Sequence, residues 1–205
     1  MFFSDAKRKL VLNYVLVALL ANKFFSLNVG ALRGKDEAKT NTNVARSFRI
    51  YATNLNCEHT APHVIEFFEC QLTWRNNRSY SSGSLVLRKP ISKLKADLVL
   101  DIYQANGRLV NVFNKTVDCC AILSTGKHGL KIFDTFLNVM FATVNERPTC
   151  PLKAHFNYTI TDFNVAESFL PAYTPKTKFR SGLYLSTSGR RSARVVVLGK
   201  VMNSV

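Results

Sequence analysis

The sequence predicts a mainly β protein, an antiparallel arrangement of short strands with one helix inserted at about residues 129–146. From Arg46 onward, short apolar segments alternate with turn-forming residues. One of them, Lys93–Tyr103, has apolar residues at every second position, as a half-buried strand does. Gly129–Glu146 instead repeats its apolar residues at intervals of three and four, which is typical of a helix. The length of 205 residues suits one domain, expected at residues 46–205 after a polar N-terminal lead at 32–45.

The segment Lys93–Tyr103 gives the most detailed expectation. After it, Asn106-Gly107 is typical of a two-residue type I′ hairpin turn, in which both central residues need positive φ. Pairing across such a turn places Leu100 opposite Phe113 on the inner face and Val99 opposite Asn114 on the outer face. Lys115 would then point inward, unless a bulge intervenes or the sheet opens there.

The remaining strands are expected to be shorter. They are predicted at residues 48–54, 66–74, 84–88 and 154–161, with a closing hairpin formed by 179–187 and 193–201 around a turn over 188–191. The apolar face of the predicted helix is wider than a single stripe, because Ile132, Phe136 and Val139 extend it. Such a helix either only plugs the core or also walls an apolar cavity.

The N-terminus has the pattern of a secretory signal peptide. A basic start, Lys7-Arg8-Lys9, precedes an apolar run at Leu10–Ala21 that is too short to span a bilayer. We expect a signal peptide at residues 1–21, with cleavage as late as residue 31; a signal anchor or a buried helix is the alternative. No later stretch is long and apolar enough to be a transmembrane segment.

Export from the cell predicts N-glycosylation and oxidised cysteines, and hence a secreted, extracellular glycoprotein. Acceptor triplets occur at Asn77, Asn114 and Asn157. The five cysteines contain no C-x-x-C and no zinc-like spacing with histidine, so disulfides are their better use.

The cysteine positions leave part of the disulfide pairing open. Cys57 and Cys70 enclose a short segment that could turn back on itself, so a bridge there would join adjacent strands. Cys150 lies just past the predicted helix, and Cys119 and Cys120 lie just before it. Neighbouring residues of a strand face opposite sides, so only one of these two can reach Cys150. The spacing does not say which one.

Several short motifs resemble a known family. They are NLNCE (54–58), FEC (68–70), NRS (77–79), NKTVDCCAIL (114–123) and Cys150-Pro151. Together they resemble a large insect family of small secreted proteins, expanded in flies, which is similar to myeloid-differentiation-related lipid-recognition (ML) domains and ganglioside-activator-like proteins. The resemblance implies an immunoglobulin-like, ML-like β-sandwich stapled by disulfides, and it links some relatives to contact chemosensation.

The resemblance also implies a disulfide pairing. The family pattern Val-Asp-x-Cys matches residues 117–120, with Cys120 as the framework cysteine. The implied bridges are Cys57–Cys70 and Cys120–Cys150, and Cys119 departs from the pattern. Cys119 is then either a buried small hydrophobe or a thiol that is reactive or forms an intermolecular disulfide.

The charge of the chain and its polar residues bear on its partners. The chain has 28 Lys and Arg against 13 Asp and Glu. Outside the cell this charge suits anionic lipid heads, sulfated glycans or simply solubility, rather than nucleic acid. Only Arg190, Arg191 and Arg194 cluster. The four histidines fall in no known catalytic or metal-binding motif, so we expect no enzyme activity, no metal and no cofactor.

These observations predict a secreted protein that binds a lipid or another hydrophobic small molecule, and the resemblance implies a chemosensory role. The candidate cavity lining consists of Leu98, Leu100, Ile102, Phe113, Phe133, Phe136, Leu137, Met140 and Phe141. The alternative is an extracellular interaction module with a filled core, which binds a receptor or an anionic glycan through a basic surface at Arg190, Arg191 and Arg194.

Overall fold

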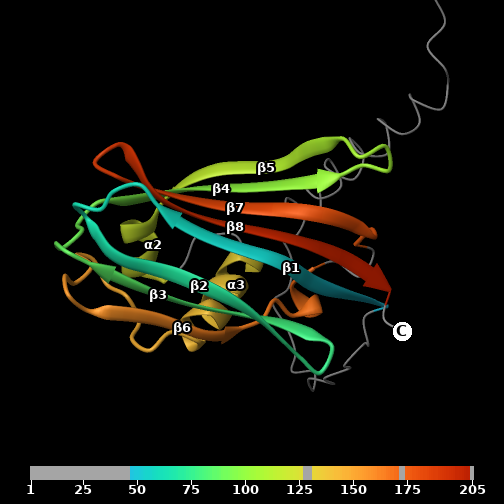
Figure 1. The fold of residues 1–205 in the computed structure, drawn as a ribbon, viewed down its shortest axis with the longest axis horizontal. Coiled ribbons are helices and arrows are strands. Elements are labelled where there is room, and N and C mark those ends of the chain that lie inside the picture. Colours follow the sequence, from blue (N-terminus) through green and yellow to red (C-terminus); the bar gives the residue numbers. More distant parts are fainter. Residues whose placement is uncertain (1–46, 127–130, 171–173, 204–205) are drawn as a thin grey trace, which may run out of the picture. The chain divides into compact units, whose positions relative to one another are not determined.

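Two antiparallel β-sheets make up most of the chain that the computed structural model describes, residues 47–126, 131–170 and 174–203 (Figure 1). The predicted signal peptide and polar lead lie outside these residues. The larger sheet has the strand order β1-β8-β7-β4-β5, and the smaller sheet has the order β2-β3-β6. The predicted mainly β, antiparallel two-sheet sandwich is therefore confirmed.

The elements follow one another in a simple order. The strands are β1 (Phe48–His59), β2 (Ile65–Arg75), β3 (Arg78–Leu87), β4 (Leu94–Tyr103), β5 (Leu109–Asp118), β6 (Asn157–Phe163), β7 (Thr177–Thr187) and β8 (Arg190–Asn203). Two α-helices, α2 (Cys119–Thr125) and α3 (Lys131–Ala142), lie between β5 and β6, and a 3-10 turn, η1 (Glu167–Phe169), follows β6.

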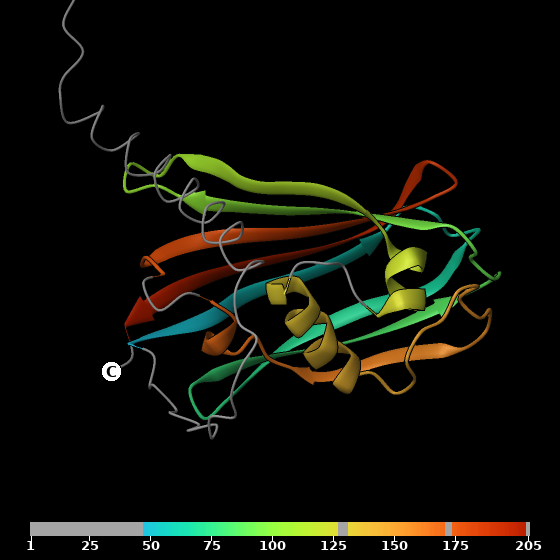
Figure 2. The same ribbon diagram turned by 180° about the vertical axis from the view of Figure 1, so that it is seen from behind.

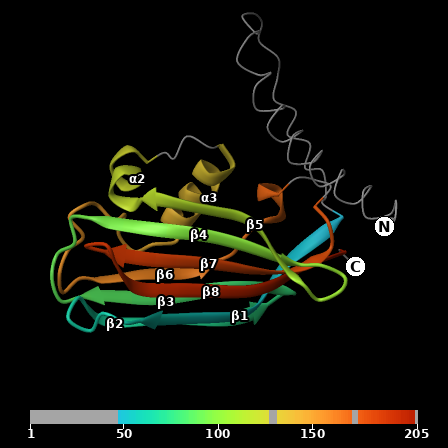
Figure 3. The same ribbon diagram turned by 90° about the horizontal axis from the view of Figure 1, so that it is seen from above.

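The two sheets approach each other along β1 and β2, and the helices lie on the other side. β1 contacts β2 and β3, and a disulfide between Cys57 of β1 and Cys70 of β2 joins the two sheets. Figures 2 and 3 show α2 and α3 over the opposite side, where α2 contacts β4 and α3 contacts β6. The sheets and helices thus surround a common interior.

The β4–β5 hairpin has the predicted register but not the predicted turn. Gly107 has a positive φ of 78°, whereas Asn106 is not in the left-handed region, so a type I′ turn is wrong here. The loop is one residue longer, and a bulge between Leu100 and Asp101 shifts the pairing back by one residue. Leu100 therefore pairs with Phe113 after all, and Val99 with Asn114.

Lys115 lies on the inner side of the larger sheet. The bulge lies on the turn side of Lys115, so it does not alter the pairing of Lys115 with Leu98. β5 is the last strand of its sheet, and Lys115 is exposed. Of the two alternatives for Lys115, a bulge or an open sheet, the structure therefore has the open sheet.

Two-residue turns with positive φ at both positions occur elsewhere. Asn76 and Asn77, with φ of 49° and 56°, connect β2 to β3. Ser188 and Gly189, with φ of 51° and 75°, connect β7 to β8. This geometry matches the right-handed twist of the flanking strands.

Helix α2 was not predicted. Cys119 and Cys120 begin this helix rather than continuing a strand, so they are not separated by the alternating faces of a strand, contrary to the prediction. Asp118 caps the helix by accepting a hydrogen bond from the Ala121 N–H at 3.0 Å. Gly126 ends it in the left-handed conformation, with φ of 68°.

Helix α3 is shorter than predicted at its C-terminal end. It ends at Ala142 rather than Glu146, because the next residues pair with β6. The Thr161 N–H donates to the Thr143 carbonyl at 2.9 Å, and Val144 forms a β-bridge with Ile160. The predicted start at Gly129 and Leu130 lies outside the described residues.

The buried core is divided into three clusters. The first gathers seven buried residues around Leu87, including Val64, Ile65 and Leu152. The second joins Ala96 and Val117 to Ile122 of α2 and Leu137 of α3. The third consists of Phe48, Ile50 and Val201.

The described residues all belong to one unit of the chain, Val44–Val205. Within them, neither α2 nor α3 nor the 3-10 turn has the length and apolar character needed to cross a membrane.

Candidate ligand-binding interior

The strand register shows which side chains face the interior. Residues directly paired in antiparallel strands point to the same face, and Ala96 of β4 lies in the cluster beneath the helices. The inner positions of the larger sheet can therefore be followed from strand to strand. Across its middle they are Leu55 of β1, Val195 and Val197 of β8, Ser181 and Leu183 of β7, Leu98 and Leu100 of β4, and Phe113 of β5.

We name these eight residues the middle belt. The belt runs between the buried ends of the sheet, with Phe48, Ile50 and Val201 at one end and Ala96, Val117 and Ala193 at the other. Each of its eight side chains is only half-buried. The inner faces of two fully packed sheets are normally buried and interdigitated. The middle of this face therefore keeps more accessible surface than these six end residues, and Ile102, Phe179 and Leu185 beside them are half-buried as well.

The smaller sheet opposes the belt with small and apolar side chains. Leu72 of β2, Ser81 and Gly83 of β3, and Ile160 and Phe163 of β6 share its inner face. Ser81 and Gly83 place little side-chain volume between the two sheets.

Helix α3 brings the predicted helical residues to the same interior. Leu137 is buried beside Ala96 and Val117, and Met140 and Phe141 pack against this cluster. Phe136 meets Phe163 edge-on, with ring centroids 5.4 Å apart. The side chain of Phe133 lies outside the described part of the chain.

The structure thus brings most of the predicted lining residues to one face. Leu98, Leu100, Ile102 and Phe113 are half-buried on the inner side of β4 and β5. Whether they line a ligand cavity stays a prediction. The inward residues of β1, β7 and β8 were not among the predicted lining residues. On β7 the alternation of Phe179, Ser181, Leu183 and Leu185 could have indicated them.

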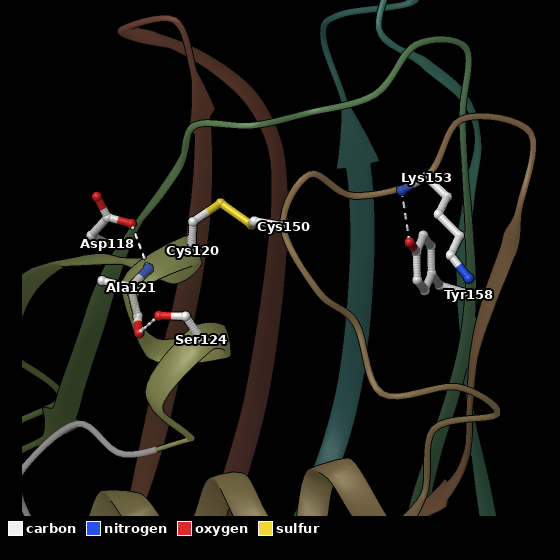
Figure 4. The surroundings of a disulfide bond; sticks show 7 residues. All are labelled: Asp118, Cys120, Ala121, Ser124, Cys150, Lys153 and Tyr158. Atoms are coloured by element: carbon white, nitrogen blue, oxygen red, sulfur yellow. Dashed lines mark hydrogen bonds between the residues drawn. A yellow bond between two sulfur atoms is a disulfide. The ribbon is translucent and has the colours of Figure 1, made fainter.

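The second disulfide anchors the helical segment. Cys120, at the start of α2, is bonded to Cys150 across a sequence separation of 30 residues. Figure 4 shows this bond beside the Asp118 cap and the hydrogen bond that Ser124 Oγ donates to the Ala121 carbonyl at 2.8 Å. Cys150 precedes a cis peptide bond to Pro151. Both disulfides of the described chain are those that the family resemblance implied.

Cys119 is the free cysteine among the described residues, and it packs against the cluster around Ala96. Burial, together with the nearby negative charge of Asp118, raises the pKa of the Cys119 thiol to about 11. A thiol with this pKa is almost entirely protonated at neutral pH and is a poor nucleophile. The contacts favour the small-hydrophobe interpretation over a reactive thiol.

The predicted basic cluster is partly neutralised. Arg194 forms an ion pair with Glu58. The pKa of Glu58 is lowered, mostly by a hydrogen bond from Asn56 and next by the hydrogen bond from Arg194. The Arg191 guanidinium lies 3.7 Å from Asp97 and stacks over the Tyr184 ring. Two of the three arginines therefore already have acidic partners.

The asparagines of the three predicted N-glycosylation triplets lie at the surface. Asn77 is in the β2–β3 turn, Asn114 is on the outer face of β5, and Asn157 begins β6; all three are exposed. Through the described ranges, no three His, Cys, Asp or Glu side chains come together as a metal site would require.

Comparison with known protein families gives a match over the centre of the chain. Residues 97–181, from β4 through the helices to β7, match the family described as "Protein of unknown function (DUF1091)". A search of the curated proteins finds no match.

Two solved structures show remote likeness. One is chicken MD-1 complexed with lipid IVa, with 14% identity, coverage of 77% of this chain and 99% of that chain, and a TM-score of 0.36. The other is the Northeast Structural Genomics Consortium target SoR45, with 11% identity, coverage of 77% and 87%, and a TM-score of 0.22. Neither likeness is close enough to bear on function. The chain is thus similar to the DUF1091 family over its central region.

Proposed function

We propose that this protein is an extracellular carrier of a lipid or another hydrophobic small molecule, held between the two sheets beneath α3. The resemblance in the cysteine motifs extends the proposal to a cuticular or chemosensory ligand.

The observation that carries the proposal is the half-buried middle belt. Seven of its eight side chains are apolar, yet they stay half-buried between the buried residues Phe48, Ile50 and Val201 on one side and Ala96, Val117 and Ala193 on the other. Apolar surface left in contact with water inside a protein is unfavourable, and an apolar guest would remove it. Each methylene group buried there would contribute roughly 0.8 kcal/mol.

The disulfides and the acceptor sites support an extracellular location. Disulfides persist mainly in oxidising compartments, and Asn77, Asn114 and Asn157 are exposed, as glycan-bearing asparagines are. We expect protein secreted from insect cells to lose mass on enzymatic removal of N-glycans. An unchanged mass would remove this part of the proposal.

The test of ligand binding begins with the native secreted protein. Organic extraction followed by mass spectrometry should reveal co-purified lipid, and the extracted protein should bind a fluorescent fatty acid at micromolar concentration or below. Absence of both would overturn the proposal.

A pair of adjacent residues on β8 tests where the ligand lies. Val197 points inward and Leu198 outward, where Leu198 is 36% exposed. Val197→Phe should fill part of the belt and weaken fatty-acid binding at least about tenfold, because overpacking leaves less room for a guest. Leu198→Phe is the matched control and should bind as the wild type does. Equal binding by both variants would place the ligand elsewhere.

The alternative function, a filled-core module that binds a receptor or an anionic glycan, has less support. It depends on Arg190, Arg191 and Arg194, and two of these are paired with Asp97 and Glu58. It also requires a filled interior, which the accessible middle belt disfavours.

A further inference from the structure

We propose that Lys115 selects the class of ligand, so that the interior takes amphiphiles with an anionic head, such as long-chain carboxylates, in preference to uncharged lipids. This inference rests on the proposed function, because it assigns the head-group end of the same site.

The position of Lys115 is unusual for a charged residue. Its ladder partner is Leu98 of the middle belt, and its neighbours on the same side of β5 are Phe113 and Val117. Val117 is buried against α2 and α3, whereas Lys115 is exposed. Lys115 therefore lies where the apolar inner face reaches solvent at the open edge of the sheet.

The charge of Lys115 is also uncompensated within the described chain. No ion pair joins it to any carboxylate there. Asp97, in the adjacent ladder pair, is on the opposite face and accepts a hydrogen bond from Thr116 at 2.6 Å while it pairs with Arg191. A guest with an anionic head would supply the missing partner.

The ammonium group of Lys115 and an anionic head group are chemically complementary. An acyl chain lying across the strands over Leu183 and Leu98 would bring its head group to the edge where the flexible Lys115 stem holds an ammonium group with three donors. Such a pair is partly exposed, so its contribution is modest and decreases with added salt. Lys115 would therefore set preference among ligands, while the apolar belt supplies most of the affinity.

The test compares a C18 fatty acid with the C18 alcohol of the same chain, each bound to the delipidated full-length secreted protein. Lys115→Ala should weaken binding of the acid roughly fivefold, and Lys115→Glu should weaken it further. Lys115→Arg should bind the acid as the wild type does, because it keeps the positive charge. Binding of the alcohol should stay unchanged in all three variants. Lys95 is the matched control, because it is exposed on the outer face of the neighbouring strand, opposite Asp118. Lys95→Ala should bind both ligands as the wild type does.

The outcomes separate this inference from the function on which it rests. If the wild type binds neither acid nor alcohol, the proposed function fails and this inference fails with it. If it binds both and Lys115→Ala changes neither affinity, only the head-group assignment is overturned. An inward-pointing charge on an edge strand can also serve to prevent pairing with another sheet. Aggregation of Lys115→Ala with unaltered acid and alcohol affinities would assign that role and overturn ours.

Discussion

Gly199 shows how the absence of one methyl group shapes the end of the larger sheet. A Cβ atom at this position would overlap the Phe179 ring and the Tyr51 carbonyl oxygen. The same ring packs against the buried cluster of Phe48, Ile50 and Val201. The glycine therefore gives Phe179 the space in which it covers that cluster.

Gly199→Ala should lower the free energy of unfolding by about 1–3 kcal/mol, because overpacking displaces both the ring and the backbone. Urea unfolding followed by circular dichroism would measure the change. Phe179→Leu should recover part of the loss in a double-mutant cycle. A stability of Gly199→Ala equal to that of the wild type would contradict the overlap.

Cys119 gives a prediction about pH. The pKa of its thiol is raised to about 11 in the folded protein, against about 8.5 in an unfolded chain. Its contribution to stability is therefore complete below the unfolded pKa and is lost as pH rises through the folded value. Between pH 9 and 11 the melting temperature of the wild type should fall more than that of Cys119→Ala, which removes the group.

Labelling gives an independent measurement of the same thiol. At pH 8 the folded protein should resist iodoacetamide, whereas the chain in guanidinium should react at one site. Rapid labelling of the folded protein, or a disulfide-linked dimer on a non-reducing gel, would restore the interpretation of Cys119 as a reactive thiol.

At the scale of elements, the disulfide Cys120–Cys150 ties the helical segment to the chain that leads into β6. It closes a longer loop than Cys57–Cys70, with separations of 30 and 13 residues. In the chain-entropy account, a longer loop restricts the unfolded state more.

Replacing Cys120 and Cys150 together by Ala should cost roughly 3.5 kcal/mol of unfolding free energy, and replacing Cys57 and Cys70 roughly 3 kcal/mol. Urea unfolding of both double variants would measure which loss of stability is larger. Cys119→Ala, which keeps both disulfides, is the control. If the Cys120–Cys150 replacement were neutral, the disulfide would not constrain the unfolded chain.

The sequence predicted most strands because their apolar residues alternate, and it missed α2 because seven residues are too few for a helical period to stand out. The local signals for α2 were present in the capping residue Asp118 and the terminating Gly126. In the β4–β5 hairpin, the pairing of Leu100 with Phe113 was correct only because a longer turn and a bulge compensate each other.

At the scale of the whole molecule, the interior could be predicted only in part. Alternation identified the inner residues of β4 and β5. On β8 the run Val195–Leu198 is apolar at every position, so no period distinguishes the inward Val197 from the outward Leu198. The accessible middle belt depends on how far apart the sheets lie, and that distance is a tertiary property without a local signal.

The two disulfides lie toward the same end of the larger sheet. Cys57 is near the last residue of β1, and Cys120 follows the last residue of β5, which lies at that end too (Figure 1). In the described chain, the other end, around Phe48 and the β4–β5 turn, has no covalent cross-link. Because that end has no covalent cross-link, the two sheets should separate there more readily than at the disulfide-bonded end.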